Sequence, residues 1–133
     1  MEKPKKILLV DDDPVTHFII QRMISYLHLS WELKIYQHPA KALWELSETD
    51  WQPDLAIVDQ HLPDISGPEL VDLLRQQGHD FRWVWISSGL TRPNLPGHLL
   101  PEAFFTKPIV ADTLHMCDTL ARLAVMQQSS NQD

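Results

Sequence analysis

The sequence predicts a single α/β domain in which strands and helices alternate around a parallel sheet. Its 133 residues are enough for one domain with its own core, and 44% of them are hydrophobic. Short apolar runs alternate with segments of helical character, which is typical of βαβ units joined by right-handed crossovers. The runs that we expect to form strands cover residues 7–10, 33–36, 55–58, 83–86 and 103–105.

The apolar runs differ in how they are expected to sit in the sheet. The first, third and fourth are continuously hydrophobic, as expected for parallel strands that are buried on both faces. In the second, Trp31, Leu33 and Ile35 alternate with more polar residues. Alternation indicates a strand with one wetter side, so we place this strand at an edge of the sheet. Trp83 and Trp85 share one side of the fourth strand, where packing is their expected role.

Helix signals lie between the apolar runs. Asp13 before Pro14 is typical of an N-cap and a first helical residue, so Asp13 is expected to cap a helix. Pro39 opens a second helical segment. A third covers residues 66–77 and is expected to end at Gly78. The last follows Pro108, with apolar residues on one face at positions 114, 117, 121 and 124.

Two segments do not fit the regular pattern. Residues 91–101 hold three prolines and a glycine, which leaves little room for a helix between the fourth and fifth strands. We expect a short turn or an irregular loop there. Residues 127–133 are polar, and we expect them to form a disordered tail after a domain that covers residues 1–126.

Composition excludes several classes of protein. The formal net charge of −7 disfavours a nucleic-acid-binding or anionic-membrane surface, because either requires clustered Lys and Arg. Cys117 is the single cysteine, which excludes an internal disulfide and fits a reducing compartment. The apolar runs are too short for a signal-peptide core or a membrane span. We therefore expect a cytoplasmic protein.

Chemically useful side chains follow four of the predicted strands. Residues 11–13 are all Asp and follow the first, Asp59 follows the third, Ser87 the fourth and Lys107 the fifth. Ligands of parallel sheets bind at the carboxyl ends of the strands, so we expect these side chains to share one crevice. Clustered carboxylates repel unless a cation intervenes, and Mg²⁺ suits carboxylate and phosphate oxygens. The pattern therefore predicts phosphoryl transfer to a carboxylate at a metal site.

With these residues at the strand ends, the chain resembles a response-regulator receiver domain of two-component signalling. Four segments carry the resemblance, in the order that the family has, and they are Ile7-Leu8-Leu9-Val10-Asp11-Asp12-Asp13-Pro14, the stretch from Asp54 to Gly67, Trp85-Ile86-Ser87-Ser88-Gly89 and Phe104-Phe105-Thr106-Lys107-Pro108. Together they span the chain from about Lys5 to Met126. The resemblance implies a flavodoxin-like (βα)5 fold with strand order 2-1-3-4-5 and, in this chain, a short or irregular fourth helix.

The resemblance also implies a role for each site residue. Asp59 is implied to be the phosphoacceptor, with Asp12 a direct ligand of Mg²⁺ and Asp11 acting on it through water. The backbone carbonyl of His61 is implied to bind the metal, and Lys107 a phosphate oxygen.

A second group of implied roles concerns switching. Ser87 and Phe104 are implied to be the switch residues, and the Lys107–Pro108 peptide bond is implied to be cis. His61 and Gly89, each two residues beyond a site residue, are expected to tune the lifetime of the phosphorylated state.

As a function, the resemblance implies a signalling switch and not an enzyme with an external substrate. The phosphoryl group is implied to come from a histidine kinase or a phosphotransfer protein, and the phosphorylated state to bind an unidentified downstream protein. No direct contact with nucleic acid or membrane is expected.

Three other functions fit parts of the pattern. A haloacid-dehalogenase-like phosphatase would use Asp11 as its nucleophile, since Asp11, Asp13 and Val15 fit an Asp-x-Asp-x-Val motif. It would leave Asp59 unexplained, and it lacks a further acidic pair after the lysine-bearing strand. A pseudo-receiver that is never phosphorylated would not need every chemical position. A dinucleotide-binding domain needs a glycine-rich turn after the first strand, which this chain lacks.

Overall fold

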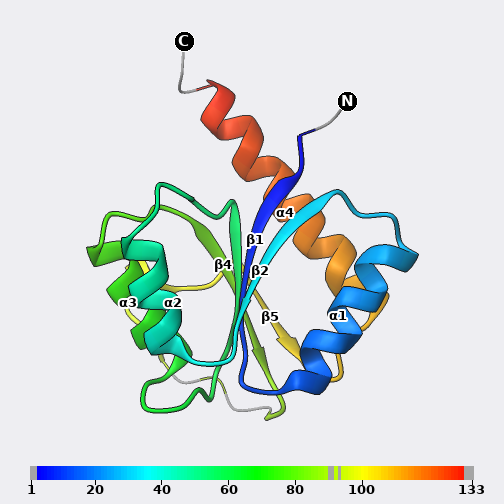
Figure 1. Ribbon diagram of the computed structural model, residues 1–133. Helices are drawn as coiled ribbons and strands as arrows, with labels where there is room; N and C mark the ends of the chain where they lie inside the picture. The colour runs from blue at the N-terminus through cyan, green and yellow to red at the C-terminus, as the bar shows by residue number, and fades with distance from the viewer. Residues whose placement is uncertain (1–2, 90–91, 93, 131–133) are drawn as a thin grey trace.

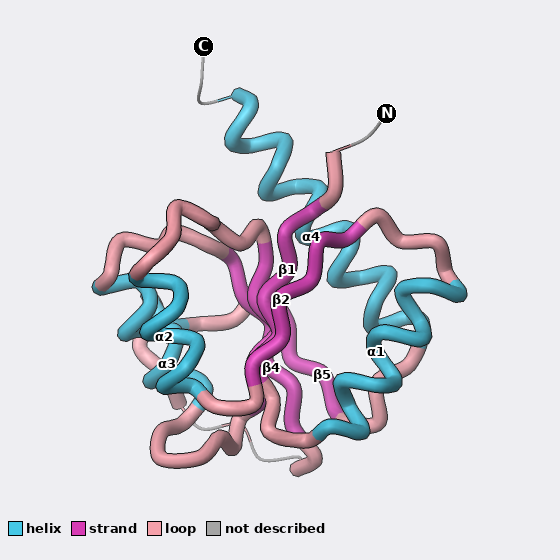
Figure 2. Tube along the Cα trace, in the orientation of Figure 1, coloured by secondary structure: helices cyan, strands magenta, loops and turns pink. Residues whose placement is uncertain are grey.

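A computed structural model describes residues 3–89, 92 and 94–130 (Figures 1 and 2). It contains a five-stranded parallel sheet in the order β2-β1-β3-β4-β5, which confirms the predicted fold and places β2 at an edge. The strands are β1 Lys5–Val10, β2 Trp31–Tyr36, β3 Leu55–Asp59, β4 Arg82–Ser87 and β5 Ala103–Thr106. Each strand overlaps a predicted run and extends it by one or two residues at one or both ends.

Helices cover both faces of the sheet, two on each side (Figure 1). They are α1 Pro14–Tyr26, α2 Pro39–Ser47, α3 Gly67–Gln76 and α4 Ala111–Ser130. Successive residues of a strand point to opposite faces of the sheet and belong to two separate cores. Leu8, Val58 and Trp85 pack on the side of α2 and α3. Ile7 and Ile57 pack on the side of α1 and α4. The two cores explain why the central strands are hydrophobic at every position.

Helix starts follow the predicted signals. Asp13 is the N-cap of α1, and its Oδ1 accepts a hydrogen bond of 3.0 Å from the Val15 N–H. Ser66 caps α3 and accepts from the Glu69 N–H. Just beyond α3, Gly78 has a φ of +99°, a conformation that glycine adopts without a steric penalty.

The fourth crossover differs from the other three. In the described part of residues 88–102, the sole helical segment is the 3₁₀ turn η1 Gly97–Leu99, which confirms the expected short element. The last helix, α4, corresponds to the one expected after Pro108, and its apolar face (Leu114, Cys117, Ala121) is buried against the sheet.

The structure has helix at residues 127–130, where the composition predicts a tail. These four residues continue α4, which ends at Ser130, so the expected boundary at residue 126 falls inside a helix. Neither proline nor glycine interrupts residues 127–130, so the helix continues past the point where the composition turns polar. Residues 131–133 lie outside the described residues.

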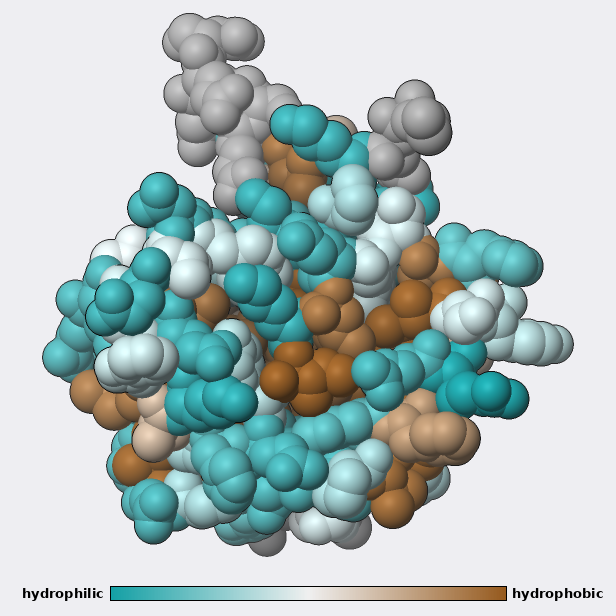
Figure 3. All heavy atoms as spheres, in the orientation of Figure 1, coloured by the Kyte–Doolittle hydropathy of each residue, from teal (hydrophilic) through white to brown (hydrophobic). Residues whose placement is uncertain are grey.

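Surface features match the edge position of β2. Figure 3 shows hydrophobic residues between the polar side chains of the flanking helices on the face where β2 lies. Leu33 and Ile35 are only half-buried, in contrast to the fully buried residues of β1 and β3. None of the helices in the described part of the chain combines the length and hydropathy needed to span a membrane.

The buried carboxylate of Asp118, on α4, contacts the first residues of β1 and β2. Asp118 accepts hydrogen bonds from Trp31 Nε1 at 2.8 Å and from Arg122 Nε at 2.9 Å, and its Oδ1 lies 3.7 Å from Lys5 Nζ. Burial raises the pKa of Asp118, but these hydrogen bonds and charges outweigh it, so the pKa lies below its ordinary value. Asp118 therefore stabilises the fold as a carboxylate.

Asp118→Asn should lower the free energy of unfolding at pH 7 by about 2 kcal/mol, because charge-assisted hydrogen bonds become neutral. Since the folded-state pKa of Asp118 is lowered, its contribution is present above the ordinary Asp pKa of about 3.9 and is lost as the pH falls through the lowered value. Urea denaturation from pH 7 to pH 3 measures this, with exposed Asp50→Asn as control. A difference that stays constant down to pH 3 would contradict the assignment.

Candidate functional site

The carboxyl ends of the strands bring three of the predicted acids together. Asp11 and Asp12 follow β1, and Asp59 is the last residue of β3, the neighbouring strand. Each offers a carboxylate oxygen, and these oxygens lie within 4.8 Å of one another. Asp11 is fully buried and Asp59 is nearly so, whereas Asp12 is exposed. We call these three residues the carboxylate cluster.

Lys107 supplies the positive charge of the site. Its Nζ lies 2.7 Å from Asp11 Oδ2 and 3.4 Å from Asp59 Oδ2, so one ammonium group serves two carboxylates. The position is fixed by the backbone, because the Lys107 N–H donates a 2.8 Å hydrogen bond to the Ser87 carbonyl. The Lys107–Pro108 peptide bond is cis, as expected.

Burial and charge shift the pKa values in this site. Desolvation and the nearby Asp11 charge raise the pKa of Asp59 above its usual range, although Lys107 and a hydrogen bond from the His61 backbone partly counter them. For Lys107, burial lowers the pKa, but the ion pairs with Asp11 and Asp59 outweigh burial, so its pKa is raised. Lys107 is therefore charged at neutral pH, and negative charge on Asp59 is disfavoured without a further cation.

Gly67 is a positioning residue to which sequence reasoning gave no role. A Cβ at this position would lie 2.4 Å from the Asp59 carbonyl oxygen and 3.1 Å from Val58 Cγ1. The start of α3 therefore passes directly over the backbone of Asp59, and the Gly67 N–H donates to the Gln60 carbonyl. The available signal was the position of Gly67, eight residues after Asp59 and at a helix start, but the need for a close approach is visible only in three dimensions.

His17 is a second residue that the sequence did not reveal. Its buried ring donates from Nε2 to the Asp11 carbonyl oxygen at 2.5 Å, from the first turns of α1. The Asp11 carboxylate, in turn, accepts from the Asp13 N–H at 2.8 Å through Oδ1. Hydrogen bonds therefore fix both the backbone carbonyl and the side-chain carboxylate of Asp11. No local pattern relates positions 11 and 17, so this contact could not be predicted.

Of the predicted switch residues, Ser87 is the last residue of β4, the strand next to β3, and Phe104 lies two residues before the end of β5. Ser87 is fully buried at the end of β4, and its Oγ accepts from the Gly89 N–H at 3.0 Å. No Ser87–Asp59 hydrogen bond occurs between these described residues. Phe104 lies farther back on β5, where its half-buried ring meets Trp85 edge-on at 5.5 Å. His61 is exposed, and a single bridge pairs it with Ser66.

The donor set of the cluster fits Mg²⁺. Three carboxylate oxygens within bridging distance of each other match a hard divalent cation, and the exposure of Asp12 leaves one side of the cluster accessible. Lys107 neutralises at most one of three negative charges. The chemistry of the residues therefore favours a cation at this position.

A family model described as "Response regulator receiver domain" matches residues 7–116. The chain belongs to this family. The resemblance that the sequence motifs carry is thereby confirmed. Receiver domains are signalling switches of two-component systems, and phosphorylation and Mg²⁺ binding are typical of them.

Other known proteins are similar to this receiver domain. The response regulator RppA of Synechocystis sp. is 32% identical over 134 residues, which cover 96% of this chain and 52% of RppA. The chain thus spans about half the length of this curated relative. A signal receiver domain from Vibrio parahaemolyticus is 19% identical with a TM-score of 0.78, covering 96% of this chain and 97% of that chain. A CheY-like receiver domain protein from Methanospirillum hungatei is 18% identical with a TM-score of 0.76. The match covers 94% of this chain and 99% of that chain. At these identities the structures support the fold alone.

Asp12→Ala should weaken Mg²⁺ binding severely, because Asp12 is the exposed member of the carboxylate cluster and Lys107 does not pair with it. Asp13→Ala should leave Mg²⁺ affinity nearly unchanged and cost about 1 kcal/mol of stability, because its carboxylate caps α1. Mg²⁺ titration followed by tryptophan fluorescence, together with urea denaturation, measures both. The opposite ranking of the two variants would refute the assignment.

Gly67→Ala should lower stability by about 1–3 kcal/mol, since the new methyl group collides with the Asp59 backbone. It should also weaken Mg²⁺ binding, because α3 or the β3 end must move. Gly97→Ala is the matched control, since a Cβ there meets nothing within 4 Å. Equal stability and equal Mg²⁺ affinity of the Gly67 variant and the wild type would show that the close approach is unimportant.

Proposed function

We propose that this receiver domain accepts a phosphoryl group on Asp59 from a histidine kinase or phosphotransfer protein and thereby switches the binding of a partner. The observation that carries the proposal is the position of Lys107, whose ammonium lies between Asp11 and Asp59 at the edge of a three-carboxylate cluster. Such a group holds a phosphoryl oxygen once Asp59 is modified.

The chemistry follows from the placement of these side chains. A carboxylate oxygen of Asp59 forms a bond to phosphorus while the P–N bond of the donor's phosphohistidine breaks. The electron pair stays on the imidazole nitrogen, which then takes a proton from solvent. Lys107 stabilises the equatorial oxygens as charge develops on them. Burial and the Asp11 charge raise the pKa of Asp59, so a cation at the cluster would favour the carboxylate form that attacks phosphorus.

Asp12, Asp59 and the backbone carbonyl of His61 are the ligands that we propose for Mg²⁺, with Asp11 acting through water. Bound Mg²⁺ would neutralise charge on the acceptor and on the transferred group. Asp11 supports this division of roles, since Oδ1 accepts from the Asp13 N–H and Oδ2 pairs with Lys107.

The burial of Asp11 argues against the phosphatase alternative. Its carboxylate is fully buried, and both oxygens already have partners, so it is poorly placed to attack an incoming phosphoryl group. Asp59 has one oxygen 3.4 Å from Lys107 and lies at the open end of β3. The geometry therefore supports Asp59 over Asp11 as the nucleophile.

The wider context belongs to the same proposal. We propose a receiver unit of residues 1–126, beyond which the last residues of α4 extend to Ser130; the family match over residues 7–116 supports the unit. The unit would catalyse only its own phosphorylation and dephosphorylation, in the cytoplasm, without direct contact with nucleic acid. RppA is about twice as long, so any output of the whole protein beyond partner binding is a separate question.

Asp59→Asn should abolish labelling by acetyl phosphate in the presence of Mg²⁺, because the amide is not a nucleophile. Mass spectrometry of the peptides should place the phosphoryl group of the wild type on Asp59, and EDTA should prevent labelling. Asp50→Asn, which alters an exposed loop, is the control. Labelling on Asp11, or undiminished labelling of the Asn variant with EDTA present, would contradict the proposal.

Ser87→Ala should still accept phosphate, more slowly, but should lose the switch. In the structure the Ser87 hydroxyl faces Gly89, so it must turn toward phosphorylated Asp59 to donate a charge-assisted hydrogen bond. Phosphate shifts the population only through such differential contacts. A Ser87→Ala protein that binds its partner only when phosphorylated would contradict this coupling.

The lifetime of the phosphorylated state should depend on His61 and Gly89. Both are exposed, and we propose that they flank the path by which water reaches phosphorylated Asp59. Phosphoryl half-lives of wild type, His61→Ala and Gly89→Lys, measured after removal of the donor, test this. Gly89→Lys should change the half-life, because a long side chain enters a path that glycine leaves open. Equal decay of all three proteins would show that water reaches the site by another route.

A further inference from the structure

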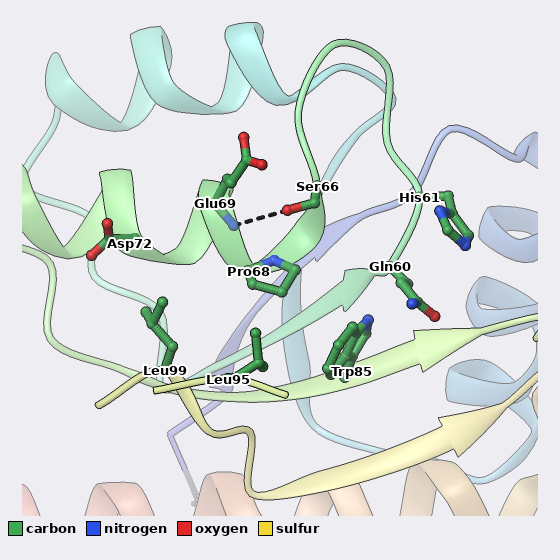
Figure 4. A pocket seen from close by; sticks show the side chains of 9 residues that line it. All are labelled: Gln60, His61, Ser66, Pro68, Glu69, Asp72, Trp85, Leu95 and Leu99. Atoms are coloured by element: carbon green, nitrogen blue, oxygen red, sulfur yellow. Dashed lines mark hydrogen bonds between the residues drawn. The ribbon is translucent and has the colours of Figure 1, made fainter. Parts of the chain in front are cut away.

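A pocket of about 430 Å³ lies beside the carboxylate cluster, between α3 and the segment that contains η1 (Figure 4). Its floor is the indole of Trp85, and Leu95 and Leu99 form one wall. Pro68 and the first turns of α3 form the other wall. The volume lies in the range of small-ligand sites and is enough for one or two large side chains. The pocket occurs where an irregular segment replaces the helix of the fourth crossover.

The wall that contains η1 is attached to α3. Arg75 donates from Nη1 to the His98 carbonyl and from Nη2 to the Phe81 carbonyl, at 2.5 and 3.0 Å. Its guanidinium also lies over the Phe81 ring, 5.6 Å from the ring centroid. One side chain of α3 therefore holds both the 3₁₀ turn and the start of β4. These contacts join the η1 wall of the pocket to α3, which forms the opposite wall.

The floor of the pocket carries an unused hydrogen-bond donor. Trp85 is 2% exposed, and its Nε1–H has no hydrogen-bond partner among the described residues. Figure 4 shows the indole nitrogen on the edge of the ring that faces Gln60, another residue that lines the pocket. A buried N–H without an acceptor costs free energy, which a ligand carbonyl oxygen would recover.

The rim of the pocket is acidic. Glu69 and Asp72 lie three residues apart on α3, so they share one face of the helix. Both line the pocket, whereas no Lys or Arg does. Glu69 is exposed, and Asp72 accepts a hydrogen bond of 3.1 Å from the neutral side-chain amide of Gln76. A cation that reaches this rim meets two carboxylates that no basic group of the lining neutralises.

We propose that this pocket docks a segment of a partner protein in which leucine-type side chains precede Arg or Lys. The apolar side chain would cover Trp85, a backbone carbonyl of the segment would accept from Trp85 Nε1, and the cation would lie against Glu69 and Asp72. A second copy of this chain is disfavoured as the occupant, because each copy carries 18 acidic against 11 basic residues. Charge complementarity therefore selects a basic partner.

The pocket shares its walls with the proposed phosphorylation site. Gln60 and His61, which line the pocket, follow Asp59 directly in the sequence. Trp85, which also lines it, is two residues before Ser87 on β4. A movement of Ser87 or of the loop after β3 would reshape the pocket, so occupancy and phosphorylation should be coupled in both directions. This coupling rests on the proposed function, whereas docking itself does not.

The test uses the unmodified, unphosphorylated full chain and three capped peptides, acetyl-Leu-Leu-Arg-Arg-amide, acetyl-Leu-Leu-Glu-Glu-amide and acetyl-Ser-Ser-Arg-Arg-amide. Two-dimensional ¹H–¹⁵N NMR resolves the indole N–H of Trp85 and reports on the pocket floor. Only the Leu-Leu-Arg-Arg peptide should shift this signal saturably. The double variant Glu69→Gln/Asp72→Asn should weaken its affinity about fivefold, as expected for two rim charges. Glu32→Gln, an exposed charge on β2, should not change it.

Each outcome decides a separate claim. An unmoved Trp85 signal with all three peptides, or equal binding of the Glu-containing and Arg-containing peptides, overturns docking. A dimer in sedimentation whose formation shifts the Trp85 indole N–H signal also overturns it, in favour of self-association. The titration is then repeated with Mg²⁺ and acetyl phosphate. Unchanged affinity in a sample that mass spectrometry shows to be phosphorylated on Asp59 overturns the coupling. Failure of Asp59 to be labelled contradicts the proposed function and leaves docking intact.

Discussion

The organisation of this receiver domain depends on one electrostatic constraint: three carboxylates share the ends of two adjacent strands with a single ammonium group. Lys107 lies 2.7 Å from Asp11 and 3.4 Å from Asp59, and Asp12 is within the same cluster. Burial and the Asp11 charge raise the pKa of Asp59, because both disfavour its ionised form. We propose that a divalent cation relieves this repulsion and that the cluster serves phosphoryl transfer. Burial of apolar residues elsewhere in the domain must offset the cost of holding these charges together.

The parallel sheet produces this cluster with little additional structure. Strands in the order β2-β1-β3-β4-β5 place the ends of β1 and β3 side by side, and they bring β4 and β5 next to them. Backbone contacts then fix the details. The Lys107 N–H bonds to the Ser87 carbonyl, and Gly67 lets the start of α3 pass directly over Asp59. Two dense cores, one on each face, keep the strand ends from moving apart.

Sequence reasoning predicted the parts of the molecule that local patterns encode. Continuous and alternating apolar runs gave the five strands and the edge position of β2, and Asp13-Pro14 gave the start of α1. The meeting of the carboxylates followed from the general rule for parallel sheets. Contacts between distant positions were not predictable: the His17 ring on the Asp11 carbonyl, the clash that excludes a Cβ at residue 67 and the Arg75 bridge to η1 have no local signature. The polar composition of residues 127–130 was misleading, because α4 continues through them.

The central claim is that the carboxylates oppose one another in the folded state and that a divalent cation relieves the repulsion. The free energy of unfolding of wild type and Asp59→Asn, measured by urea denaturation with and without Mg²⁺, tests it most directly. At neutral pH without Mg²⁺ the Asn variant should be more stable, and the difference should vanish as the pH falls through the raised pKa of Asp59 toward the ordinary value of about 3.9. Mg²⁺ should stabilise the wild type more than the variant. An Asn variant that is less stable without Mg²⁺ and gains equally from its addition would contradict the account.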